Sequence, residues 1–120
     1  MNQKEIRNYL IGRAKMGVTI HYGSLNQLLD SPYDLTQSYE RHQLGEDLGD
    51  ISEFEHSQGR PLLSSIVVAE ENGLPGVGFF EMAERLHDVD GKPLFDPTSL
   101  SKKKYLSQEQ KKVFEYWKSH

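Results

Sequence analysis

The chain has 120 residues, 36% of them hydrophobic, no cysteine, and a formal net charge of −4. Its length suits one domain over residues 1–120, since typical domains run from about 50 to 250 residues. The lack of cysteine excludes disulfides, thiolate zinc sites and cysteine nucleophiles.

No apolar run approaches the roughly 20 residues that span a bilayer. The first residues, MNQKEIRNYLIGRAKMG, mix charged and apolar side chains and lack the apolar core of a signal peptide. A chain without cysteine also suits a reducing compartment. We therefore expect a cytoplasmic protein with no membrane partner.

Charge is unevenly distributed along the chain. Residues 1–29 carry four basic side chains against one acidic one, and residues 97–120 carry six lysines against two glutamates. Between them, residues 30–96 carry fifteen acidic side chains against four basic ones. If the two ends pack side by side, they form a basic face on an acidic body. The alternative is that basic ends only keep an acidic middle soluble.

Two helices and a short strand are predicted before residue 32. Apolar residues repeat every four positions over residues 2–15, which indicates a helix. Residues 18–20 are β-prone. Ser24 is a suitable N-cap for a second helix, and Pro32 ends it because proline disfavours helix in the preceding residue.

A third helix is predicted from Leu35 or Thr36 to about His56. Its apolar stripe consists of Leu44, Leu48, Ile51 and either Phe54 or Glu55. Its opposite face is acidic and holds Glu46, Asp47, Asp50 and Glu53. Gly45 and Gly49 lie four apart within it, and each costs a helix interior roughly 1 kcal/mol relative to alanine. Either another backbone element approaches closely there, or the helix breaks near Gly45.

A strand and a hairpin are predicted over residues 62–78. Residues 62–69 are rich in β-branched and apolar side chains, as in a central strand. Asn72-Gly73 is the preferred pair for a two-residue hairpin turn. Pro75 cannot donate to a ladder, so the return arm over residues 74–78 belongs on an edge. Phe79 then begins a fourth helix.

The last part of the chain is predicted to be irregular and then helical. Residues 88–104 are rich in turn residues, and Asp88-Val89-Asp90-Gly91 begins like a calcium loop but lacks the later ligands. Ser107 and Gln110 form a capping box for a final helix. Its apolar stripe is Val113, Phe114 and Trp117, so this helix is expected to dock on the domain.

The order of these elements is that of a winged-helix domain. We predict an α/β (α+β) fold of winged-helix type, with about five helices around a small two- to three-stranded sheet and a hairpin at 62–78.

Four segments carry a resemblance to a known family. VTIHYGSL begins at Val18, LGEDLG at Leu44, SSIVV at Ser64, and NGLPGVGF at Asn72. VTIHYGSL resembles the VTTYGxLA entry of one DNA-binding domain, and LGEDLG resembles its AVGxAL recognition-helix segment. SSIVV takes the place of its Pro-Cys-His-Arg-Val active-site strand, and NGLPGVGF resembles its Gly-rich wing. That domain belongs to the O6-alkylguanine-DNA alkyltransferases and alkyltransferase-like proteins. The resemblance covers about residues 17–80 and implies a DNA-binding winged helix.

The chain departs from that family at two functional positions. It has no Pro-Cys-His-Arg motif, so alkyl transfer to a cysteine is impossible. Arg41-His42-Gln43 replace the small apolar residues that precede the first glycine of the recognition segment. The same pattern also resembles an uncharacterised family of small bacterial proteins, which implies no activity.

Recognition of a macromolecule is the predicted function, by one of two routes. Arg41, His42 and Gln43 near the third helix, with Arg60 beneath the strand, could contact the phosphates or bases of nucleic acid. The acidic face of that helix opposes this route, because carboxylates repel phosphate. Only a route through the basic ends of the chain or the Asn72-Gly73 arm avoids this repulsion. Alternatively, the edge strand and the Leu74-Pro75 arm, with Tyr22, Tyr33 and Tyr39, could dock a protein partner, since aromatic side chains are favoured anchors.

A hydrolase is the third alternative. Glu53, Glu55 and His56 could act as a base beside Ser64 or Ser65. Carboxylates near a histidine are common on solvated helices, and no histidine has metal-ligand spacing. We therefore predict a non-catalytic recognition module of a bacterial cytoplasmic protein, without metal or cofactor, that binds a protein partner or nucleic acid. Its binding residues are predicted to be Tyr22, Arg41, His42, Gln43, Arg60, Asn72 and Gly73.

Overall fold

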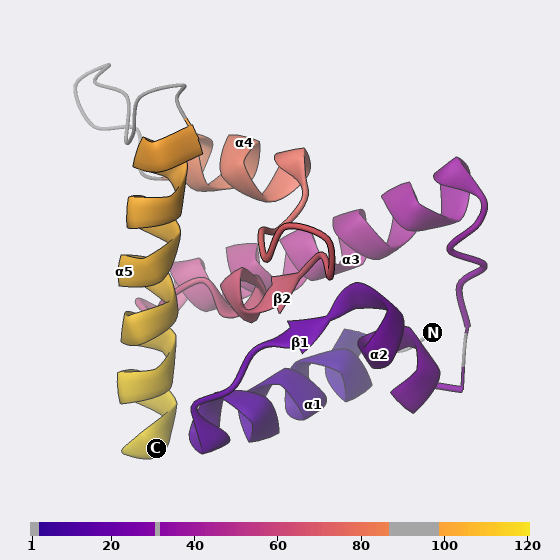
Figure 1. Cartoon of the computed structure of the whole chain (residues 1–120). Helices are drawn as coiled ribbons and strands as arrows, with labels where there is room; N and C mark the ends of the chain where they lie inside the picture. The colour runs from indigo at the N-terminus through magenta and orange to yellow at the C-terminus, as the bar shows by residue number, and fades with distance from the viewer. Residues whose placement is uncertain (1–2, 31, 87–98) are drawn as a thin grey trace.

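The computed structural model describes residues 3–30, 32–86 and 99–120. Five α-helices, one 3-10 helix and two short strands make up this part of the chain (Figure 1). In chain order they are α1 (Gln3–Met16), β1 (Ile20–His21), α2 (Tyr22–Leu28), α3 (Ser38–Ser57), η1 (Leu63–Ile66), β2 (Val67–Val68), α4 (Val77–Leu86) and α5 (Ser99–Lys118). The predicted five helices and small sheet are present, in a mostly helical structure that is compatible with the predicted α+β class.

The sheet joins two segments that are far apart in the chain. Its strands are parallel, with Ile20 opposite Val67 and His21 opposite Val68. Parallel pairs are normally covered on both faces. Here α1, α3 and α5 all pack against η1, which leads directly into β2 (Figure 1). The pairing also brings the first turn of α2, which follows β1 without a break, to the end of β2.

Two clusters of apolar side chains form the core. The larger one packs residues of α1, α3 and α5, such as Ile6, Leu48 and Val113, around η1 and β2. The smaller one packs Phe80 and its neighbours in α4 on Leu106 of α5. The two clusters together fix α4 above the sheet and beside α3.

The strand predicted over residues 62–69 is wrong except at Val67 and Val68. The Leu62 amide donates to the buried Glu109 carboxylate of α5, at 2.7 Å. The Ser64 amide donates to the Ser52 hydroxyl of α3, at 2.9 Å. Because buried backbone donors need a partner, these side chains satisfy the donors that a β-ladder would use. Tertiary contacts therefore override the β-propensity of this run.

The hairpin predicted at 62–78 is also wrong. No strand follows Asn72-Gly73 in the described part of the chain, and β2 pairs with β1 instead. Gly73 has a φ of 70°, but Asn72 lacks the positive φ that a two-residue hairpin turn requires. The turn closes through two 2.8 Å bonds, from the Ala69 amide to the Leu74 carbonyl and from the Gly73 amide to the Ala69 carbonyl.

The helices occur where they were predicted, with different ends. α3 is continuous through Gly45 and Gly49, so the break near Gly45 does not occur. α2 begins at Tyr22, ahead of the predicted cap at Ser24. α5 begins at Ser99, so residues 99–104 are helical rather than irregular, and Ser107 lies inside the helix where it cannot cap it. The calcium-like segment at 88–91 lies outside the described residues.

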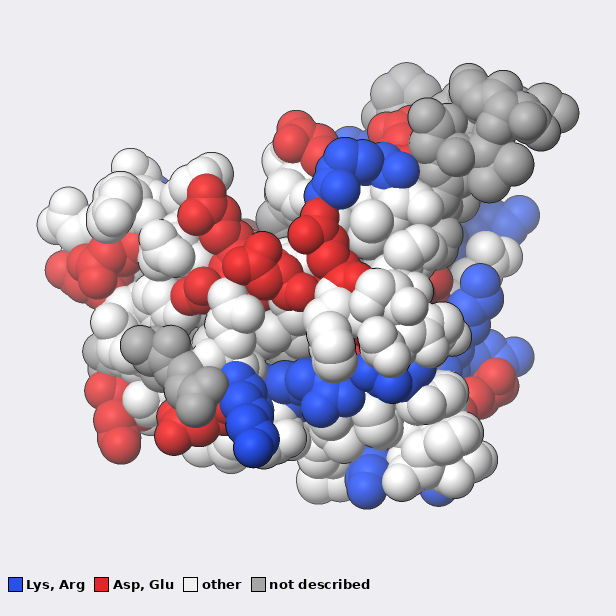
Figure 2. Space-filling view, turned by 180° about the vertical axis from the view of Figure 1, so that it is seen from behind, with Lys and Arg blue, Asp and Glu red and all other residues white. Residues whose placement is uncertain are grey.

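The two ends of the chain pack together. α1 crosses the C-terminal part of α5 and packs against it (Figure 1). Figure 2 shows most lysine and arginine side chains of one face in a band below a group of acidic side chains. The molecule therefore has a basic side built on α1 and α5 and an acidic side built on α3. None of the described helices is long and apolar enough to cross a membrane.

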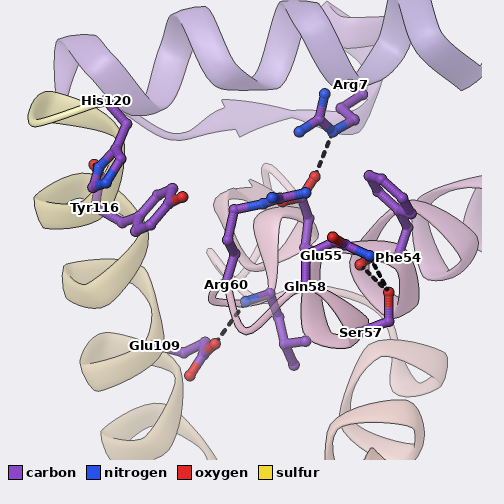
Figure 3. A network of polar contacts seen from close by, with 10 residues as sticks. Arg7, Phe54, Glu55, Ser57, Gln58, Arg60, Glu109, Tyr116 and His120 are labelled. Carbon is purple, nitrogen blue, oxygen red and sulfur yellow. Dashed lines mark hydrogen bonds and ion pairs between the residues drawn. The ribbon is translucent and has the colours of Figure 1, made fainter.

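A buried carboxylate links α1, α3 and the turn before η1. Glu55 of α3 has no exposed surface, and it accepts ion-paired hydrogen bonds from Arg7 of α1 and Arg60 (Figure 3). The hydrogen bond to Glu55 raises the pKa of Arg60 above its ordinary value. Both guanidinium groups lie 5.5 Å from the ring centroid of Phe54, within cation–π range. Glu55 thus takes the last position of the predicted apolar stripe, while the half-exposed ring of Phe54 lies beside the two arginines.

We expect Glu55→Gln to lower the free energy of unfolding by about 3 kcal/mol, because removing one partner of a buried ion pair leaves charges uncompensated. The matched control is Glu53→Gln, which breaks a largely exposed pair with Arg85 and should cost less than about 1 kcal/mol. Urea unfolding followed by circular dichroism measures both. Equal losses in the two variants would show that Glu55 does not hold the helices together.

Candidate functional site

A hollow with a volume of about 1060 Å³ lies between α3 and α4. It is lined by the first turns of α2, by α3 from Arg41 to Glu53, by the segment that follows β2 and by one face of α4. Its edge residues, such as His21, Arg41 and Glu70, are exposed, so it opens to solvent. We call this hollow the groove. Its volume is at the upper end of the roughly 300–1,000 Å³ typical of ligand sites.

The floor of the groove is apolar. Leu44 and Leu48 of α3 face Phe79 and Met82 of α4, and all four side chains are buried. They belong to the two core clusters, so the floor is the outer surface of the core. A side chain seated on this floor would bury apolar surface against a rigid support.

Two residues of α3 that line the groove, Gly45 and Gly49, have no side chain. A Cβ added at Gly49 would lie 3.9 Å from the Met82 sulfur, so this glycine is in ordinary contact with α4. A Cβ at Gly45 would have nothing within 4 Å. No packing contact within the described chain therefore requires glycine at position 45. Neither explanation offered by the sequence holds, because α3 is continuous and no backbone of another element lies within 4 Å of a Cβ added at either glycine. Gly45 instead leaves open space in the groove.

The rim of the groove is acidic. Carboxylates line it from α3 and from the segment after β2; they are Glu46, Asp50, Glu53, Glu70 and Glu71. Figure 2 shows acidic side chains gathered around the hollow on the face seen from behind. Two guanidinium groups, of Arg41 and Arg85, oppose these five carboxylates.

The segment between β2 and α4 forms the front wall of the groove. Besides the turn closed by Ala69, the Asn72 side chain accepts from the Leu74 amide at 2.9 Å. The Gly76 amide donates to the Tyr22 hydroxyl of α2, at 2.8 Å. Burial raises the pKa of Tyr22, and the bond from Gly76 acts in the opposite direction. The neutral hydroxyl of Tyr22 thus ties the front wall to α2.

The structure brings together three of the seven predicted binding residues. Tyr22, Arg41 and His42 line the groove. Arg41 donates to the Leu35 carbonyl at 2.8 Å, and His42 lies 3.1 Å from Glu46.

The other four predicted residues lie elsewhere. Gln43 is half-buried and lies 3.5 Å from an oxygen of Asp47. Arg60 is committed to Glu55, on the side of α3 that packs on α1. Asn72 and Gly73 do not line the groove but shape the turn that carries Glu70 and Glu71 to it.

The hydrolase alternative finds little geometric support. Of its proposed residues, Glu53 and Ser64 line the groove, whereas His56 and Ser65 do not. Glu53 is paired with Arg85, and the Ser64 hydroxyl shares a 2.6 Å hydrogen bond with Ser52. The described residues include no group of three or more side chains that could hold a metal ion.

The chain matches no protein-family model, no curated protein and no solved structure with which it was compared.

Sequence reasoning missed half of the groove. The sequence predicts a helix that begins at Phe79 but no binding surface on it, and it gives Glu70 and Glu71 no role. Their contribution to the groove depends on the parallel pairing of β1 with β2, which no local sequence pattern predicts. The acidic residues of α3 were recognised, and three of them, Glu46, Asp50 and Glu53, line the groove.

We expect Tyr22→Phe to loosen the front wall, because it removes the hydroxyl that accepts from the Gly76 amide. Since such a bond contributes roughly 0.5–1.5 kcal/mol, hydrogen exchange at Gly76 should accelerate about three- to tenfold. Amide exchange measured by NMR tests this. Tyr39→Phe, at an exposed tyrosine of α3, is the control and should leave the rate unchanged. Unchanged exchange in Tyr22→Phe would mean that the wall is held by its own turn alone.

Proposed function

We propose that the chain is a non-catalytic recognition module that docks a protein partner in the groove. The observation that carries the proposal is the groove itself, where an apolar floor lies beneath an acidic rim and is open to solvent. An apolar floor with a polar rim is the usual anatomy of a protein-docking surface. The proposal places the module in the bacterial cytoplasm, a setting that a chain without cysteine suits.

Binding is a better account of the groove than catalysis. A hydrolase with a serine nucleophile requires that serine within hydrogen-bond reach of its base. The Ser64 hydroxyl is instead bonded to Ser52, and the Glu53 carboxylate to Arg85. The groove supplies surface, charge and shape, which are the requirements of recognition.

The rim favours protein over nucleic acid. Phosphate contacts dominate the affinity of proteins for nucleic acids, and five carboxylates on the rim would repel a phosphate backbone. The two arginines of the groove are both engaged, Arg41 with the Leu35 carbonyl and Arg85 with Glu53.

Alkyltransferase-like DNA binding is the second candidate, and one observation favours it. The four segments that carry the resemblance all contribute to the groove, through Tyr22 and Gly23, Gly45 and Gly49, Ser64, and Gly76 and Gly78. In this proposal α2 and α3 are the paired helices of a winged helix, and the segment between β2 and α4 takes the place of the wing.

Site-specific crosslinking tests the docking proposal. With p-benzoylphenylalanine in place of Gln27, an exposed residue on the edge of the groove, we expect a discrete protein adduct on irradiation in cells of the natural host. The same label in place of Gln108, exposed on α5 and outside the groove, should give none.

The crosslink must also depend on the groove being open. Gly45→Gln fills the space beside α3, so we expect it to abolish the adduct formed from position 27. Gly12→Gln is the matched control, since Gly12 is an exposed mid-helix glycine of α1 with nothing within 4 Å of an added Cβ. An adduct that survives Gly45→Gln, or that forms equally from position 108, contradicts docking in the groove.

A salt titration separates the two candidates. The docking proposal predicts no binding to a labelled duplex or single strand at roughly 50 mM salt. Fluorescence anisotropy measures this for the wild type, for Arg41→Ala, and for Lys111→Ala, which removes the same charge outside the groove. Binding that falls linearly with the logarithm of salt, and weakens in Arg41→Ala alone, would replace docking by the DNA-binding candidate.

A further inference from the structure

The carboxylates of the groove exceed the cations available to them. Glu53 pairs with Arg85, and Glu46 lies 3.1 Å from the imidazole of His42. Asp50 accepts from the neutral side chain of Gln3, at 3.0 Å, and so keeps its full charge. Within the described residues, no ion pair neutralises Asp50, Glu70 or Glu71.

These three carboxylates stand on two sides of the groove. Asp50 projects from α3, whereas Glu70 and Glu71 follow β2 in the front wall. All three are exposed. A ligand between the walls would therefore face negative charge on both sides, and a cationic ligand would be attracted by both walls.

The floor between these walls is apolar. Leu48, Phe79 and Met82 lie at its base, and the absence of a side chain at Gly45 leaves the approach along α3 clear. A volume of about 1060 Å³ exceeds the space that one side chain fills. The groove can thus hold several consecutive side chains, with apolar ones downward and charged ones at the rim.

We infer that the groove binds a basic segment of a partner protein, with an apolar side chain of that segment on the floor and its lysine or arginine side chains between Asp50 and Glu70-Glu71. The inference rests on the function proposed above, because it names the chemistry of the partner that the groove docks. Charge complementarity selects this occupant, since the rim repels acidic segments and phosphates.

Selection from a random peptide library tests the inference. Phage-displayed dodecapeptides are selected in parallel on the wild type, on Gly45→Gln and on the Gly12→Gln control. The wild type and the control should enrich peptides with a positive net charge and at least one large apolar residue. Gly45→Gln should not enrich them.

The most enriched peptide then probes the rim. In fluorescence anisotropy, the double variant Glu70→Gln/Glu71→Gln should bind it roughly tenfold more weakly. The control is Glu81→Gln/Glu115→Gln, which removes the same charge from exposed positions of α4 and α5 outside the groove and should bind nearly as the wild type does. Equal weakening in both would assign the effect to the overall field of the protein and overturn the inference.

The remaining outcomes separate this inference from the proposed function. Groove-dependent peptides that carry no positive charge would overturn the inference and leave docking in the groove intact. Equal enrichment of the same peptides on Gly45→Gln and on the wild type would overturn both the inference and the proposed function. If the wild type sediments as a dimer that Gly45→Gln converts to a monomer, the occupant is a second copy of this chain and the inference is wrong.

Discussion

Glu55 imposes a requirement that the rest of the described fold meets. A carboxylate without exposed surface is costly to bury unless cations and hydrogen bonds surround it. Arg7 and Arg60 supply the cations, so α1 must lie against the last turns of α3, and the chain must turn back immediately after that helix. This turn starts the run through η1 and β2 that ends at the groove. The position of Glu70 and Glu71 thus depends on an ion pair on the opposite side of α3.

α3 serves two purposes along its length. Its C-terminal part is buried among α1, η1 and α5 through Ile51, Ser52 and Glu55. Its N-terminal part carries Gly45 and Glu46 past the edge of the core, where they line the groove. One continuous helix therefore connects the region that stabilises the fold to the region that we propose binds a partner. That connection makes the groove a surface held in place by the core, as a recognition site requires.

Much of the fold could be predicted from sequence, and the errors have a common cause. Periodicity located all five helices, because an amphipathic stripe such as Leu44, Leu48 and Ile51 is a local signal. The strand predicted over residues 62–69 is mostly wrong, because two side chains distant in sequence, of Glu109 and Ser52, accept hydrogen bonds from its backbone amides. Arg60 was predicted to bind a ligand because the sequence does not reveal that Glu55, one of two candidates for the last position of the apolar stripe, is buried and pairs with it. Only the pairing of β1 with β2, which is not local, reveals that Tyr22 and Glu70 border the same groove.

The segregation of charge between the α1–α5 side and the α3 side makes the molecule a strong electric dipole. In the field of a charged partner, such a dipole experiences a torque before any contact forms. A positively charged surface would turn the groove toward itself and the α1–α5 side away. Diffusional encounters would then begin in a productive orientation more often than chance allows, and added salt would remove this advantage by screening. The same packing of the two chain ends that completes the core therefore also sets the direction from which the protein is approached.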